Sequence, residues 1–149
     1  MADLFTYVYD PKKVAVAIGN LEEVPGLNGI GAHSLTGFAE GTFVNVEKNE
    51  DKYTMVSGGQ EETTRVVHGN NQGTLTITLK HTSPSNAVLG KIANSDKIVS
   101  VWVSDQNTDG ALFAGGDEAW LQKPAAQSRG NSVENITWVF SIAKYGQLQ

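Results

Sequence analysis

The chain has 149 residues, a length that suits one domain with a core large enough to need no disulfides. It contains no cysteine, which excludes disulfides and thiolate metal sites. The net charge is −5, and the clustered basic side chains that grip nucleic-acid phosphates are missing. The sequence also shows neither a signal peptide nor an apolar run of about 20 residues that could span a bilayer, so no membrane partner is expected.

Short runs of β-branched residues separated by Gly, Asn and Asp indicate a mostly β chain. The first predicted strand covers residues 13–18, where Val16 and Ile18 share one face. Residues 21–34 are rich in glycine and are predicted to form a loop. Residues 36–47 are predicted to form a second, longer strand, with bulges or bends at its glycines.

Residues 48–62 are polar and rich in turn-forming residues, and they are predicted to form an extended loop or hairpin arm. Segments of this length without structure of their own are usually functional or disordered. Because the arm carries apolar side chains, we expect it to contact a neighbouring subunit; a plain surface loop is the competing interpretation. The residues expected at that contact are Asp51, Lys52, Tyr53, Met55, Val56, Gly58 and Gly59.

The clearest pattern is the strict alternation from Thr74 to Lys80, which predicts a strand. Its apolar residues, Leu75, Ile77 and Leu79, are expected to face the core, and its threonines the opposite side. Further strands are predicted at residues 63–68, 98–104, 111–114, 119–122 and 135–143.

One helix is predicted over residues 84–94. Ser83 is a suitable N-cap, and Pro84 suits the first helical position. An apolar stripe that can pack on a sheet follows, made of Val88, Leu89 and Ile92. Several strands, one helix and then further strands favour an antiparallel sandwich or barrel with one flanking helix, and residues 1–149 are expected to form a single domain.

Residue types that carry catalysis or bind metals are present, but their spacing does not predict a site. None of the three histidines lies at a metal-binding spacing from another. Neighbouring acids such as Asp117 and Glu118 would point to opposite faces of a strand, which favours solvation over a glycosidase pair. Residues 105–110 lack the glutamate and the flanking helices of a calcium loop and are predicted to form a hairpin turn. No catalytic, cofactor-binding or metal-binding residue is expected.

The most specific sequence feature is the segment 73–89, in which the alternating strand runs into Ser-Pro-Ser-Asn and an apolar helix. Three further stretches accompany it: Tyr9-Asp10-Pro11-Lys12-Lys13-Val14, Gly37-Phe38-Ala39-Glu40-Gly41 and Ala119-Trp120-Leu121. Together, in order and over most of the chain, these stretches resemble the tail tube proteins of tailed bacteriophages. That family consists of small structural proteins found mostly with contractile tails, those of myoviruses.

The resemblance implies two packed antiparallel sheets with one outer helix. It also implies hexameric rings whose inner sheets join into one barrel around a channel for DNA ejection, with no enzymatic activity and no cofactor. The implied partners are further copies of the chain and the sheath, tape measure, tail terminator and baseplate proteins. The implied cargo is duplex DNA, which must pass through the channel without binding to its wall. The implied location is the virion tail, after synthesis in the bacterial host cytoplasm.

A channel for DNA constrains its wall, because Lys and Arg on the wall would bind phosphate. The chain has 16 acidic and 11 basic residues, so a neutral to acidic wall is easy to build. The polar faces of residues 36–47 and 73–80 are expected to supply it; an outward position, toward a sheath or solvent, is the competing interpretation. The candidate lumen-facing residues are Asn45, Glu47, Thr74, Thr76 and Thr78.

Other functions compete with a phage tail tube. The tube of a phage-like contractile injection device shares the implied architecture. A carbohydrate- or ligand-binding β-sandwich could use Trp102, Trp120 and Trp138 as a platform, although positions in the core or at an interface are favoured for them. A hydrolase built on the acidic pairs is the weakest alternative.

Overall fold

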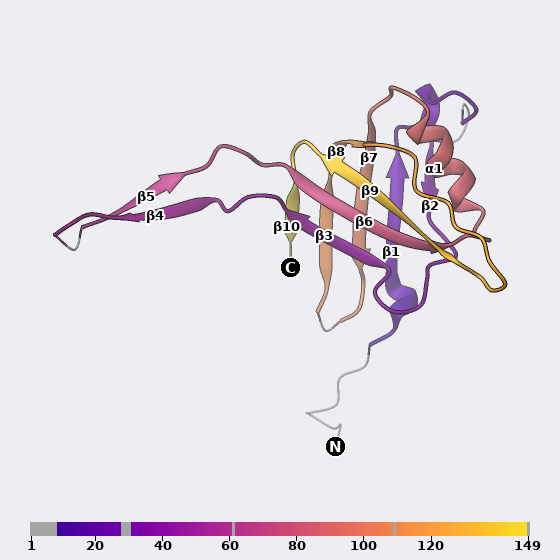
Figure 1. The fold of residues 1–149 in the computed structure, drawn as a ribbon, viewed down its shortest axis with the longest axis horizontal. Helices are drawn as coiled ribbons and strands as arrows, with labels where there is room; N and C mark the ends of the chain where they lie inside the picture. Colours follow the sequence, from indigo (N-terminus) through magenta and orange to yellow (C-terminus); the bar gives the residue numbers. More distant parts are fainter. Residues whose placement is uncertain (1–8, 28–30, 61, 109, 149) are drawn as a thin grey trace, which may run out of the picture.

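Figure 1 shows a curved β-sheet body with one helix at its side and a long hairpin that projects from it. The structure, a computed structural model, describes residues 9–27, 31–60, 62–108 and 110–148. The strands described are β1 (Val14–Gly19), β2 (Ala32–Ser34), β3 (Val44–Lys48), β4 (Tyr53–Ser57), β5 (Thr63–Val67), β6 (Gly73–Lys80), β7 (Val99–Asp105), β8 (Leu112–Leu121), β9 (Asn135–Ile142) and β10 (Gly146–Leu148). The helical elements described are α1 (Ser85–Ala93) and two 3-10 helices, η1 (Pro11–Lys13) and η2 (Leu21–Glu23).

The body is built on an eight-stranded antiparallel sheet in the order β2-β1-β7-β8-β9-β6-β3, with β10 paired to β8. The sheet folds over because β8 pairs mainly with β7 along its first half and with β9 at its end. The inner sides of the two halves therefore pack into one core, to which Ile18 and Val101 contribute from one half and Ile77 and Phe140 from the other. The mostly β class, the packed antiparallel layers and the single helix are confirmed.

The strand predicted from strict alternation is β6, in the middle of one half of the body. Leu75, Ile77 and Leu79 are fully buried, and the residues between them are half-buried on the opposite side. Each buried residue lies opposite a buried residue of β9, in the pairs Leu75–Phe140, Ile77–Trp138 and Leu79–Ile136. Cross-strand apolar pairs of this kind stabilise a sheet and fix its register.

Helix α1 covers the predicted range 84–94 to within one residue at each end. Leu89 and Ile92 are buried in the main core, and Val88 packs against it. The helix begins one residue later than predicted, with Pro84 at the N-cap position, and the hydroxyl of Ser83 accepts a hydrogen bond from the backbone N–H of Ser85 at 3.2 Å.

The Ser83-Pro84-Ser85-Asn86 segment joins the helix to the chain before β3. The hydroxyl of Ser83 donates to the backbone carbonyl of Thr36, and the hydroxyl of Ser85 accepts from the Thr36 N–H at 3.0 Å. Gly37, next to Thr36, has φ +72°, and a Cβ there would lie 2.6 Å from Cβ of Ser83. Only glycine therefore lets the two segments approach this closely.

Asn86 is the second part of this junction. Its side-chain amide donates to the backbone carbonyls of Lys80 and His81, at 2.9 and 3.3 Å, at the end of β6. Its Oδ1 accepts a hydrogen bond from Nε1 of Trp138 on β9. The polar residues of the Ser-Pro-Ser-Asn segment thus fix the position of α1 against the sheet.

Two sequence-based expectations before β4 are wrong. The strand predicted at residues 36–47 is limited to β3, because Gly37 and Gly41 have φ angles of +72° and +82° and interrupt the extended backbone. Only Phe38 forms an isolated bridge in that stretch, with Leu79. The loop predicted at residues 21–34 contains η2 and β2, and β2 pairs with β1.

The two short strands predicted at residues 111–114 and 119–122 are parts of one ten-residue strand, β8. Two glycines lie between the predicted strands, and close packing requires them. A Cβ on Gly115 would lie 2.1 Å from the carbonyl oxygen of Val101, and one on Gly116 would lie 2.7 Å from that of Lys144. The glycines therefore let β8 pass close to its neighbours.

Candidate assembly surfaces

The outward sides of β3, β6 and β9 form a polar sheet face, which we call the threonine face. Between β3 and β6, Asn45 lies beside Thr76, and Glu47 lies beside Thr74; on the other side of β6, the same threonines lie beside Val139 and Ser141 of β9. All five candidate lumen-facing residues lie on this face, because Thr78 follows on the same side of β6. The face consists of Asn45, Glu47, Thr74, Thr76, Thr78, Lys80, Asn135, Thr137, Val139 and Ser141.

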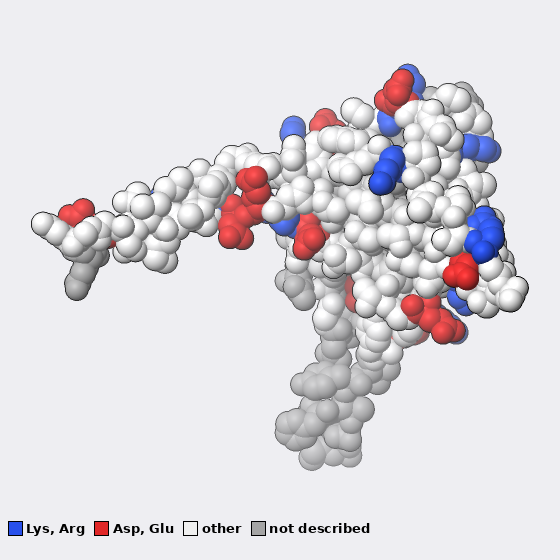
Figure 2. Space-filling model, in the orientation of Figure 1, with Lys and Arg blue, Asp and Glu red and all other residues white. Residues whose placement is uncertain are grey.

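The threonine face is close to neutral. Its one acid, Glu47, and its one base, Lys80, lie at opposite ends of the strands. Between them lie hydroxyl groups, and the hydroxyl oxygens of Thr78 and Thr137 are 3.5 Å apart. Figure 2 shows that charged side chains gather mainly around the margins of this side of the body and at the root of the projecting hairpin. The face can therefore form hydrogen bonds without a strong field of either sign.

Tyr145 packs against the core on the inner side of β6, at the end where this strand begins. A Cβ on Gly73 would lie 2.6 Å from the Tyr145 ring, so the ring packs directly on the glycine backbone. Burial, and secondarily the carboxylate of Glu47, raises the pKa of the Tyr145 phenol above its ordinary value. The backbone N–H of Tyr145 donates to the carbonyl of Asn71 at 2.8 Å. Tyr145 thus ties the root of the hairpin to the body.

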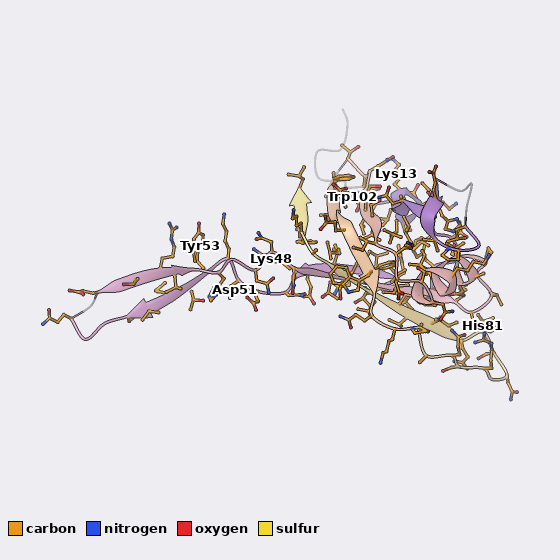
Figure 3. The ribbon with its side chains drawn as sticks, turned by 90° about the horizontal axis from the view of Figure 1, so that it is seen from above. Lys13, Lys48, Asp51, Tyr53, His81 and Trp102 are labelled. Carbon is orange, nitrogen blue, oxygen red and sulfur yellow. The ribbon has the colours of Figure 1, made fainter. Side chains whose placement is uncertain are left out.

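The projecting hairpin, residues 49–72, is called the arm. Its strands β4 and β5 form a separate two-stranded antiparallel sheet, which extends away from the body in both ribbon views (Figures 1 and 3). Every residue of both strands is exposed. An isolated hairpin of two strands is only marginally stable in water. The arm is therefore a surface that a further chain would stabilise by covering it.

The register of β4 with β5 gives the arm two different faces. The first, called the tyrosine face, carries Tyr53, Met55, Arg65 and Val67. On it the Arg65 guanidinium lies 4.1 Å from the centroid of the Tyr53 ring. The second, called the Val56–Val66 face, is uncharged and consists of Thr54, Val56, Thr64 and Val66.

The candidate contact residues lie along the first half of the arm. Two precede β4, three belong to it and two are in the turn after it: Asp51 and Lys52, then Tyr53, Met55 and Val56, then Gly58 and Gly59. The returning strand β5 lies outside the range 48–62. The sequence predicts a strand at residues 63–68 but does not identify its partner. The glycine pair between two short β-branched runs is the signal for that hairpin.

The three tryptophans do not form a common platform. Trp138 is 2% exposed in the core, which is one of the favoured positions. Trp120 lies on the outward side of β8, and Trp102 stacks on Phe113 with ring centroids 4.8 Å apart. A carbohydrate platform of three rings is therefore not present.

The histidines and carboxylates of the described residues do not gather into a metal-binding cluster. Within residues 9–27, 31–60, 62–108 and 110–148, no group of three or more His, Asp or Glu side chains could hold a metal ion. Each histidine takes part in a local contact: His33 with the hydroxyl of Ser85, His68 with that of Thr54, and His81 with the backbone N–H of Glu134. In the same part of the chain, no helix is long and apolar enough to cross a membrane.

Comparisons with known proteins agree with this architecture. The family described as "Bacteriophage PhiTE tail tube protein" matches residues 25–148. Structural protein ORF10 of Pseudomonas phage KPP10 is 28% identical over 144 residues, which cover 92% of this chain and 79% of that protein.

Solved structures share the fold at low sequence identity. The cap of the anti-feeding prophage, which terminates its tube, has a TM-score of 0.60 at 7% identity and covers 99% of this chain and 95% of its own. A chain of the anti-feeding prophage baseplate has a TM-score of 0.59 at 12% identity, with 99% and 97% covered. These likenesses establish the fold.

The family match covers residues 25–148, which is most of the chain. The chain belongs to the PhiTE-type family of phage tail tube proteins. Its role is that of a structural protein of the phage tail tube, and the resemblance seen in the sequence is confirmed.

Proposed function

We propose that the chain assembles into hexameric rings that stack into a tail tube, through which phage DNA is ejected into the host. The observation that carries this proposal is the arm, an exposed hairpin that extends away from its own body. If the arm of one copy contacts the body of another, the contact is heterologous. Such contacts repeat and generate rings or open-ended tubes.

The edges of the main sheet support the same assembly. The last strands of the sheet order are β2 and β3, so each has one edge that no strand of the described residues pairs with in this sheet. Unpaired edges readily recruit strands from other chains. In the proposed ring, an edge of each subunit contacts the next subunit, and the same rotation relates every neighbouring pair. Six such contacts close the ring.

The threonine face lines the channel in this proposal. Its ten outward positions include one acid and one base, Glu47 and Lys80, so the face offers phosphate no cluster of cations. A wall rich in Lys and Arg would bind the DNA backbone and slow its passage. Hydroxyl and amide groups keep the wall wetted while the DNA moves past it. The channel wall in this proposal is therefore close to neutral, which lies within the neutral to acidic range expected from the sequence.

The arm contacts a neighbouring subunit across the joint between rings. Its candidate contact residues remain Asp51, Lys52, Tyr53, Met55, Val56, Gly58 and Gly59, to which the structure adds Arg65, Val66 and Val67 of β5 as exposed candidates. Met55 is 72% exposed and Val67 is 65% exposed. Covering these side chains removes apolar surface from water, which favours association.

The proposed partners are the sheath, tape measure, tail terminator and baseplate proteins of a contractile tail, and the proposed location is the virion tail, after synthesis in the bacterial cytoplasm. The chain is proposed to have no enzymatic activity. A tube of a phage-like contractile injection device is the second candidate, favoured by the fold shared with the anti-feeding prophage. The family match to a phage tail tube favours DNA as the cargo.

Assembly is tested by measuring the mass of the purified protein over a range of concentrations and by imaging concentrated samples in negative stain. The proposal predicts hexameric rings or hollow rods of uniform diameter that increase with concentration. A protein that stays monomeric at every concentration, and that adds to no tube even with phage-derived tail initiators, would contradict it.

A further inference from the structure

A third exposed surface lies on the outward side of β7, β8 and β10, on the half of the body opposite the threonine face. We call it the aromatic patch. Trp102 and Phe113 stack there with an interplanar angle of 8°. Phe113 is directly opposite Leu148 of β10, and these two side chains are 45% and 72% exposed. A shallow hollow of about 520 Å³ opens beside Phe113 and Leu148.

The centre of the aromatic patch carries no charge, while acids lie at its margins: Asp105 lines the hollow, and Asp117 and Glu118 are exposed farther along β8. The outward residues of β1, β7 and β10 are Ala15, Ala17, Gly19, Ser100, Trp102, Ser104, Gly146 and Leu148. A charged partner group placed over the centre of the patch, on Trp102 and Phe113, would lose hydration there without gaining an opposite charge. The patch therefore suits an occupant that is itself uncharged and partly apolar.

The Val56–Val66 face of the arm has this chemistry. Val56 and Val66 are 52% and 41% exposed, and the remaining residues of that face are threonines. The tyrosine face is less suitable, because Arg65 lies on it over the ring of Tyr53. Two sheets pack well when uncharged faces meet at the usual spacing of about 10 Å. The Val56–Val66 face and the centre of the aromatic patch are thus both uncharged and partly apolar.

The arm cannot reach the patch of its own copy, because it extends away from the body (Figures 1 and 3). In Figure 3, Tyr53 rises from the arm toward the same side on which Trp102 lies on the body. The Val56–Val66 face therefore points the opposite way. When copies stack head to tail and all turn the same side toward the channel, the Val56–Val66 face of one arm can lie over the aromatic patch of another copy.

We propose that the aromatic patch of one subunit receives the Val56–Val66 face of the arm of a second copy. This inference rests on the proposed tube and names the surfaces that meet in it. It places the aromatic patch away from the channel, under the arm of a neighbour. It also leaves the tyrosine face of the arm, with Met55 and Arg65, on the outer side of that contact.

The chain has no cysteine, so engineered cysteine pairs test the contact directly. The double variant Val56→Cys with Leu148→Cys is assembled and oxidised, and its products are separated without reductant. We expect a ladder of covalent oligomers, because each copy offers both halves of a heterologous contact. Met55→Cys with Leu148→Cys is the matched control, since residue 55 is the adjacent residue on the other arm face. Val56→Cys with Thr76→Cys tests the other side of the body. Both controls should assemble but give no covalent oligomers when their products are separated without reductant.

A single substitution provides the second measurement. A photoreactive benzophenone amino acid replaces Val56, the assembled protein is irradiated, and the cross-linked peptide is identified by mass spectrometry. Attachment to β7, β8 or β10 supports the inference. Two results would overturn the inference while leaving the tube proposal intact, provided that tubes form normally. One is a ladder from the double variant Val56→Cys with Thr76→Cys. The other is attachment of the benzophenone to β3, β6 or β9. If no oligomers of any kind form, the proposed function fails as well.

Discussion

The indole Nε1 of Trp138 donates a hydrogen bond to Oδ1 of Asn86 over 2.9 Å, and this bond joins the middle of β9 to the first turn of α1. Trp138 is 2% exposed, so its N–H has lost water and depends on this acceptor. The same amide group of Asn86 donates to carbonyls at the end of β6. One side chain therefore connects two strands of the sheet to the helix.

Replacing Asn86 with Ala should lower the free energy of unfolding by about 1–3 kcal/mol, because a buried donor and several carbonyls lose their partners. A urea titration followed by tryptophan fluorescence measures the change. Asn135→Ala is the matched control, since Asn135 is exposed on the outward side of β9, and it should cost less than about 0.5 kcal/mol. Equal effects of the two substitutions would show that the Asn86 junction adds no stability.

Tyr145 predicts a loss of stability at high pH. Its phenol has a pKa above the ordinary value of 10.0 because of burial first and the Glu47 carboxylate second. The folded state therefore holds the proton more tightly than the unfolded chain. The resulting stability is fully present below pH 10.0 and is lost as the pH rises through the folded-state pKa.

The free energy of unfolding should thus fall as the pH rises above the ordinary phenol pKa of 10.0, and Tyr145→Phe should make that fall less steep. Tyr9→Phe is the control, because Tyr9 is 60% exposed, and it should keep the wild-type slope. An unchanged slope in Tyr145→Phe would mean that the phenol does not contribute to the pH dependence.

The arm can be removed without cutting the body. The N–H of Asn49 donates to the carbonyl of Gln72 at 2.9 Å, so β3 and β6 already form a closed hairpin at that point. Replacing residues 50–71 with an Asn-Gly turn, which favours tight hairpins, should leave the core folded, with little change in the free energy of unfolding. The shortened protein should form no tubes in negative stain. Normal tubes from a protein without its arm would show that the arm is not needed for stacking.

The neutrality of the threonine face predicts how assembled tubes respond to DNA. Wild-type tubes should show no measurable binding to duplex DNA near physiological salt. Thr76→Lys adds one cation per subunit at the centre of the face and should create binding that weakens steeply with salt. The matched control is Ser34→Lys, on the exposed strand β2 of the other half of the body. It should not create DNA binding. Co-sedimentation of tubes with labelled DNA measures both, and equal binding by the two variants would place the channel elsewhere.

The sequence predicts those parts of the fold whose signal is local. The alternation of Thr74 to Lys80 and the apolar stripe of α1 each reflect one element packed against one core. The polar sides of β3 and β6 lie next to each other because the two strands pair, while their position at a channel stays a prediction.

The features that the sequence does not predict depend on distant contacts. Gly115 lies within β8 because Val101 leaves no space for a side chain, and nothing next to Gly115 in the sequence indicates this. The return of the arm through β5 depends on pairing Tyr53 with Val67, which no single strand pattern specifies. The aromatic patch depends on β10 lying beside β8, a pairing between residues far apart in the chain.

A helical reconstruction of wild-type tubes by electron cryomicroscopy tests the central claim most directly. The account predicts six subunits in each ring, with Asn45, Glu47 and Thr76 facing an open channel and the aromatic patch covered by protein away from that channel. A reconstruction in which Trp102 and Phe113 line the channel, or in which the arms touch no neighbouring subunit, would contradict it.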